Sequence, residues 1–132
     1  MTGFQTFYDF GSLQRFISSF KKKPSVGVVP TMGALHVGHL SLIDRALNEN
    51  DLVVVTIFVN PKQFNNPKDL ENYPRVPESD LSLLRKYERV AVCLPEEKDV
   101  YPSEDPYTQV SLGLLDLVLE GEFRPGHFAG VA

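Results

Sequence analysis

The stretch that decides the fold is PTMGALHVGHLSLIDRA, residues 30–46. It continues an apolar run and contains two of the chain's three histidines, His36 and His39, each close to a glycine. Glycine is a poor helix former, and histidine is less often fully buried than the aliphatic residues. The pattern therefore indicates a strand, a tight turn and the start of a helix, with polar side chains that packing does not require.

The segments around this turn predict alternating strands and helices. The runs at 26–30 and 52–59 are almost continuously apolar, as expected for strands covered on both faces of a parallel sheet. An apolar stripe at helical spacing lies between them at 40–47. Strand, helix and strand within about 35 residues form a right-handed βαβ unit. With a third apolar run at 90–94, we expect an α/β fold built as a Rossmann-like, doubly wound parallel sheet.

Weaker patterns suggest the remaining elements. Asp9 is expected to cap a helix that runs to about residue 22. A loop should occupy 60–77, and a third helix should surround Leu81 and Leu84. Residues 108–112 resemble a short fourth strand, and 114–119 a helical turn. We find no repeat and no linker that would split the chain, so one compact domain is expected.

Composition narrows the class of protein. The chain has 132 residues and a formal net charge of −4. A nucleic-acid-binding surface needs clustered basic residues, and the sequence offers only the short run at 21–23, so nucleic-acid binding is not expected. No window is apolar enough for a membrane span, and the first twenty residues do not resemble a signal peptide. The single Cys93 excludes an intrachain disulfide and is expected to be buried and inert. A cytoplasmic protein is the expectation.

The turn itself suggests an anion site. Gly33 and Gly38 would let the backbone approach a ligand, and a helix N-terminus favours negative charge. His36 and His39 would share one face of the first helical turn and donate hydrogen bonds to phosphate oxygens. Two alternatives stay open: a helix start with solvated histidines, and a zinc site that includes His127. Neither the dinucleotide-binding glycine motif nor a P-loop is present.

Three signatures together resemble a known family. PTMGALHVGHLSL resembles the HIGH-type signature of the nucleotidylyltransferase superfamily. With IFVNPKQFNNPKDLENYPR (57–75) and EGEFRPGHFAGV (120–131), it is similar to the pantoate–β-alanine ligase (pantothenate synthetase) family. DVYP (99–102) also fits the family pattern. The resemblance covers the chain from Val26 onward and implies a HIGH-type nucleotidylyltransferase fold.

The resemblance implies a ligation in two steps, with pantoate, β-alanine and ATP as substrates and Mg²⁺ as the accompanying ion. Pantoate and ATP would give pantoyl adenylate and pyrophosphate, and β-alanine would then displace AMP to form pantothenate, a coenzyme A precursor. His39 and His36 would be the catalytic hydrogen-bond donors. Gln63, Asn60 and Met32 would bind the substrate. The implied ATP-binding residues are Pro30, Thr31, Met32, Gly33, Ala34, Leu35, His36, Val37, Gly38 and His39.

Accessory residues follow less directly. Glu120, Arg124 and His127 in the third signature would lie near the active site, with surface positions as the alternative. Asp80 would help to hold Mg²⁺ through water, since this ion prefers one or two carboxylates and keeps most of its waters. A solvated helix position is the alternative for Asp80.

The chain ends directly after the third signature, whereas family members continue. We therefore expect residues 1–132 to be the N-terminal ATP- and pantoate-binding portion of a longer protein, truncated before the second half of the fold and with little ligase turnover alone. A homodimer is expected for the full-length protein, and the state of the fragment stays open. The alternatives are a nucleotide-binding domain without turnover, or an adenylyltransferase with another acceptor.

Overall fold

The computed structural model describes residues 3–102 and 111–132. Its strands are β1 (Gln5–Phe7), β2 (Val26–Thr31), β3 (Leu52–Ile57) and β4 (Val90–Cys93). Its helical elements are α1 (Phe10–Ser18), α2 (Val37–Glu49), η1 (Pro61–Gln63), α3 (Pro67–Asn72), α4 (Pro77–Leu84), α5 (Glu97–Val100), η2 (Gly113–Asp116), α6 (Glu120–Phe123) and α7 (His127–Val131). Within the described ranges, none of these helices has the length and apolar character needed to cross a membrane.

The chain divides into two compact units. The first comprises Met1–Phe58 and Pro74–Val100, and the second comprises Val59–Tyr73 and Tyr101–Ala132. The first unit holds the sheet and the turn that follows β2. The second holds η1, α3 and the short helices near the chain end.

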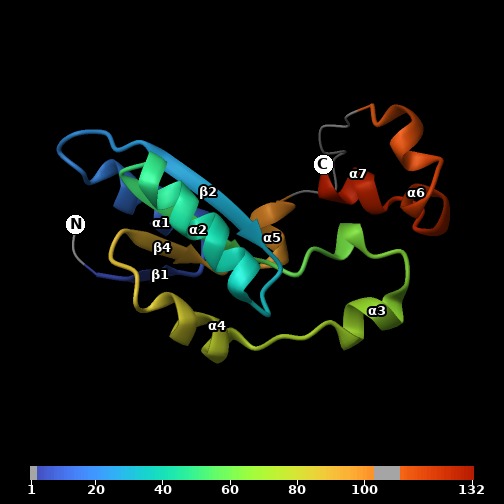
Figure 1. The fold of residues 1–132 in the computed structure, drawn as a ribbon, viewed down its shortest axis with the longest axis horizontal. Coiled ribbons are helices and arrows are strands. Elements are labelled where there is room, and N and C mark those ends of the chain that lie inside the picture. Colours follow the sequence, from blue (N-terminus) through green and yellow to red (C-terminus); the bar gives the residue numbers. More distant parts are fainter. Residues whose placement is uncertain (1–2, 103–110) are drawn as a thin grey trace. The chain divides into compact units, whose positions relative to one another are not determined.

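The sheet of the first unit is parallel throughout and has the order β1-β4-β3-β2 (Figure 1). Strands β2, β3 and β4 confirm that the three apolar runs are strands. The expected cover on both faces is wrong for β2, an edge strand in which Val28 and Pro30 are exposed. The short edge strand β1 was not expected. The expected strand at 108–112 lies mostly outside the described residues, and Ser111 and Leu112 form no strand.

Helices cover both faces of this sheet. Val53 and Val55 of β3 pack with Ile43 of α2 and with Leu81 and Leu84 of α4. The intervening β3 residues, Leu52 and Val54, pack with Leu13 of α1 and with Cys93 of β4 on the other face. Because successive strand residues point to opposite faces, continuous burial of β3 requires both layers. The doubly wound α/β architecture is therefore confirmed.

Helix α1 begins where the sequence predicted and ends earlier. The Asp9 carboxylate accepts hydrogen bonds from the Ser12 backbone N–H at 2.7 Å and from its hydroxyl at 2.8 Å. These bonds lower the pKa of Asp9 below its usual value. The helix ends at Ser18, where the Ser19 hydroxyl donates to the Phe16 carbonyl. The lysines at 21–23 therefore lie beyond the helix.

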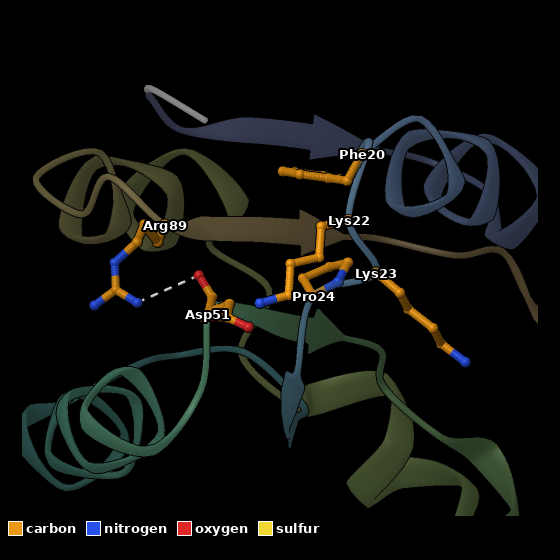
Figure 2. Close-up of a pocket in the computed structure, with 6 residues that line it drawn as sticks. All are labelled: Phe20, Lys22, Lys23, Pro24, Asp51 and Arg89. Atoms are coloured by element: carbon orange, nitrogen blue, oxygen red, sulfur yellow. Dashed lines mark hydrogen bonds between the residues drawn. The ribbon is translucent and has the colours of Figure 1, made fainter.

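Part of this basic run borders a pocket at the amino ends of the strands. The pocket has a volume of about 230 Å³ and is lined by Phe20, Lys22, Lys23, Pro24, Asp51 and Arg89. Arg89 donates to the carbonyls of Leu47, Asn50 and Asp51. Its positive charge therefore stabilises the C-terminal end of α2. Figure 2 shows Lys22 turned toward Asp51 and Lys23 pointing away.

The second unit is built around an asparagine and a glycine. The segment expected as a loop at 60–77 contains η1 and α3, both with proline in the first turn and an asparagine cap. The Asn60 side chain donates to the Gly130 carbonyl at 3.0 Å and joins η1 to α7. A Cβ atom at Gly130 would lie 2.0 Å from the Lys62 carbonyl oxygen.

We predict that Gly130→Ala disrupts the second unit selectively. The new methyl would overlap a backbone atom that cannot rotate away, so we expect destabilisation of the second unit by more than the about 1–3 kcal/mol of ordinary overpacking. Amide hydrogen exchange should show lost protection in η1 and α7 and unchanged protection in β2 to β4.

Gly126→Asn is the matched control. Gly126 has φ 77° and nothing within 4 Å of a Cβ atom, and asparagine tolerates this backbone region. Equal protection in Gly130→Ala and the wild type would contradict the packing described here.

Candidate active site

The turn after β2 begins at a buried threonine. The Thr31 hydroxyl donates to the Thr56 carbonyl at 2.9 Å and accepts the Gly33 N–H at 3.2 Å. The Thr31 carbonyl accepts the Phe58 N–H at 3.0 Å. These bonds fix the end of β2 against β3 and start the turn, so the Thr31 side chain serves the backbone rather than facing solvent.

Two left-handed residues follow, Gly33 at φ 84° and Ala34 at φ 51°. Asp80 of α4 supports them: one carboxylate oxygen accepts the Ala34 N–H at 3.0 Å and the other accepts the Leu35 N–H at 2.8 Å. The Leu35 side chain enters the core and is 8% exposed. The backbone of this turn is therefore fastened to the interior of the first unit.

The two histidines stand at the N-terminus of α2, and each ring accepts a backbone N–H of the first helical turn. His36 Nδ1 accepts the Gly38 N–H at 3.1 Å, and His39 Nδ1 accepts the His36 N–H at 3.1 Å. An Nδ1 atom that accepts a hydrogen bond carries no proton, so the proton of each neutral ring is on Nε2. Both rings therefore offer one Nε2–H donor beside a helix N-terminus, the arrangement predicted for an anion site.

The two rings also influence each other's charge. Their centroids are 4.1 Å apart, with His36 exposed and His39 partly buried. Burial, and then the proximity of His36, lower the pKa of His39 below that of a free histidine, against a smaller opposing effect of Asp80. His39 is therefore a neutral donor at neutral pH.

The second unit brings Gln63 and His127 together. His127 Nδ1 lies 2.7 Å from the backbone carbonyl oxygen of Gln63 and donates to it, because a carbonyl only accepts. Within residues 3–102 and 111–132 the Gln63 side-chain amide has no hydrogen-bond partner. Asn60 differs: it is 9% exposed, and its amide bonds Lys62 N–H, the Tyr101 hydroxyl and the Gly130 carbonyl. Asn60 thus organises the segment that presents Gln63.

The other residues predicted to bind ATP or substrate make fewer of the contacts described above. Pro30 and Val37 are exposed, and Met32 is partly buried. Glu120 is exposed at the start of α6, and the Arg124 N–H donates to the Glu120 carbonyl at 2.8 Å. Their predicted binding roles stay predictions.

Asp80 requires a correction. It is 2% exposed, so the solvated helix position is wrong. Across the described part of the chain, no group of three or more His, Cys, Asp or Glu residues is placed to hold a metal ion. Spacing could not have revealed the role of Asp80, because its partners lie 45 and 46 residues away. Tyr101 was also missed as the partner of Asn60, although DVYP had pointed to this segment.

Known proteins match nearly the whole chain. The model of the family described as pantoate-beta-alanine ligase matches residues 5–132. The pantothenate synthetase of Porphyromonas gingivalis is 48% identical over 130 residues, which are 97% of this chain and 46% of the relative. That of Ruegeria pomeroyi is 57% identical over 108 residues, or 82% of this chain and 38% of the relative. The chain thus spans less than half the length of these relatives.

Solved structures similar to this chain come from the same family. A pantoate-β-alanine ligase from Francisella tularensis, complexed with β-γ ATP and β-alanine, has a TM-score of 0.84 and 42% identity over 96% of this chain and 49% of that chain. A pantothenate synthetase from Thermus thermophilus has a TM-score of 0.83 and 41% identity, with 96% and 45% covered. Both likenesses extend over nearly all of the present chain.

We predict that Gly38→Ala impairs the site without unfolding the chain. A Cβ atom at Gly38 would lie 2.8 Å from Cε1 and 3.0 Å from Nδ1 of His36, so the exposed ring must turn away. Alanine gains up to about 1 kcal/mol of helix propensity over glycine. We expect an unchanged or raised unfolding temperature. Calorimetry with ATP, the ligand that the sequence motif predicts, should show at least about tenfold weaker binding than in the wild type. Unchanged binding would show that the His36 ring does not contribute.

A second prediction concerns the protonation of His39. Imidazole ¹⁵N shifts should show the Nε2–H tautomer for both rings and a pKa of His39 below about 6.5. Protonation then favours the unfolded chain, so the stability that depends on neutral His39 is present above about pH 6.5 and is lost as the pH falls toward the folded-state pKa.

His39→Gln is the control for this titration. Glutamine at this helix position can still accept the His36 N–H but does not titrate, so part of the acid sensitivity should disappear in denaturation curves between pH 7.5 and 5. An Nδ1–H tautomer in the wild type would refute the assignment.

Proposed function

Since the chain belongs to the pantoate–β-alanine ligase family, we propose that it forms the ATP- and pantoate-binding part of an enzyme that joins pantoate to β-alanine. The product is pantothenate, a coenzyme A precursor. The observation that carries the proposal is the pair of imidazoles at the N-terminus of α2, each with its Nδ1 atom bound to a backbone N–H and its proton on Nε2.

The first step requires stabilised phosphate charge. A carboxylate oxygen of pantoate attacks the α-phosphorus of ATP, the bond from that phosphorus to the bridging oxygen breaks, and pyrophosphate leaves with the electron pair. Two neutral Nε2–H donors and the helix N-terminus stabilise the charge that grows on the phosphate oxygens. His36 and His39 thus act as hydrogen-bond donors and transfer no proton.

Binding of pantoate is assigned to Gln63. The Gln63 side-chain amide can donate to the pantoate hydroxyl or carboxylate without forming an ion pair, and His127 holds the Gln63 backbone carbonyl. In the second step the β-alanine amine attacks the acyl carbon of pantoyl adenylate. The bond to the AMP oxygen breaks, AMP leaves, and the ammonium so formed gives up a proton.

Magnesium would enter this reaction with the nucleotide. Both oxygens of Asp80 accept backbone N–H groups, and the residue is 2% exposed, so this carboxylate does not fit a magnesium ion that keeps most of its waters. Mg²⁺ would therefore arrive as part of the MgATP substrate. The whole enzyme is further proposed to be cytoplasmic and homodimeric.

The test is calorimetry on the chain of 132 residues with MgATP and with pantoate. We expect the wild type to bind both, and Gln63→Ala to lose at least about tenfold in pantoate affinity while ATP affinity is retained. The magnitude follows from one hydrogen bond to a charged group, worth about 1.5–3 kcal/mol.

Gln14→Ala, an exposed amide on α1, is the matched control and should leave both affinities unchanged. ATP binding without any pantoate response would instead favour a nucleotide-binding domain without turnover. Binding of another acid in place of pantoate would favour an adenylyltransferase with a different acceptor.

A further inference from the structure

We propose that Asp80 is a positioning residue: its buried carboxylate holds the turn at 33–35 in the conformation that aims His36 and His39. Its effect on the reaction is exerted through the backbone rather than through a bound metal. The inference deepens the proposed function and depends on it only for the catalytic consequence, since the positioning itself is a property of the free chain.

The turn needs such support because its backbone is strained. Ala34 has φ 51°, a left-handed conformation that costs an L-residue about 1–2 kcal/mol. Strain of this kind persists only where the surroundings enforce it. The Ala34 and Leu35 N–H groups supply that constraint when both donate to Asp80, at 3.0 and 2.8 Å.

The same contacts decide where a ligand phosphate can bind. Successive N–H groups in such a turn form a concave nest that commonly receives an anion. Here the anion is the chain's own carboxylate, which is 2% exposed. Phosphate is thereby excluded from the nest and directed to the Nε2–H groups and the first turn of α2. The N–H groups of Ala34 and Leu35 thus act by aiming the histidines.

Packing allows little variation at this contact. A Cβ atom at Gly33 would lie 3.0 Å from the second Asp80 carboxylate oxygen and 3.2 Å from Cγ2 of Ile57. Asn at position 80 would keep the shape of Asp but place an NH₂ group against one of the two backbone N–H donors. One acceptor would remain for two donors, and the other N–H would be buried without a partner.

The test compares Asp80→Asn with the wild type in the free chain, in buffer that contains a metal chelator. We expect the amide resonances of Ala34 and Leu35 to move and the imidazole ¹⁵N shifts of His36 and His39 to change. Glu78→Gln removes a carboxylate from the same helical turn at an exposed position and should change neither set. Unchanged histidine signals in Asp80→Asn would overturn the proposal, because a metal-binding Asp80 has no effect without metal.

A second measurement serves if Asp80→Asn does not fold. In the wild type the Ala34 and Leu35 N–H groups lie outside helix and strand, yet both should be protected from hydrogen exchange. Rapid exchange of either would overturn the proposal without any variant.

The catalytic consequence is measured separately, by ATP–pyrophosphate exchange dependent on pantoate in the full-length enzyme. We expect Asp80→Asn to lower kcat about 10²-fold, as for other small misplacements of reacting groups, with a smaller change in KM for ATP. Altered histidine signals in the free chain, with no exchange activity in the wild-type enzyme, would support the positioning role and refute the proposed function. A raised KM for Mg²⁺ with unaltered histidine signals would refute the positioning role alone.

Discussion

Two backbone N–H groups that share one buried carboxylate hold the first unit's site together. The contact joins α4 to a turn that lies more than forty residues earlier in the chain. It compensates the burial of a charged group, which would otherwise be costly, and it offsets the strain of a left-handed alanine. The turn, the N-terminus of α2 and the two imidazoles therefore form one rigid assembly with Asp80 behind it.

This assembly separates the work of the peptide backbone from that of the side chains. The N–H groups of the turn are satisfied internally, and the Nδ1 atoms of both rings are used as helix caps. What remains for a ligand is a pair of Nε2–H donors and the positive end of a helix of 13 residues. This arrangement is the basis for proposing an anion site there. Neutral donors suit the proposed first step, in which negative charge moves onto the oxygens of the leaving pyrophosphate.

The sequence predicted the parts of the fold whose evidence is local. Strands β2, β3 and β4 are continuous apolar runs, and Asp9 is an ordinary helix cap. Strand β1 escaped because three mixed residues carry no pattern, and their pairing with β4 is set by a partner more than eighty residues away. Helix α3 had a readable signal, since Asn66 and Pro67 are a cap and a first-turn proline. That signal was overlooked because asparagine and proline are equally common in loops.

The same limit applies to the site. The histidines and Gln63 could be identified from motifs, whereas the roles of Asp80 and Tyr101 depend on contacts across the fold and have no local pattern. The sheet also determines how the chain's only cysteine behaves. Cys93 of β4 is fully buried in the cluster that also contains Leu13 of α1 and Val54 of β3. This burial, together with Asp9 and Asp99, raises the pKa of its thiol to about 11. Because the thiolate is the reactive form of cysteine, alkylating agents and peroxides would react very slowly with Cys93 in the folded chain. Its chemistry is thus insulated from the redox state of its surroundings.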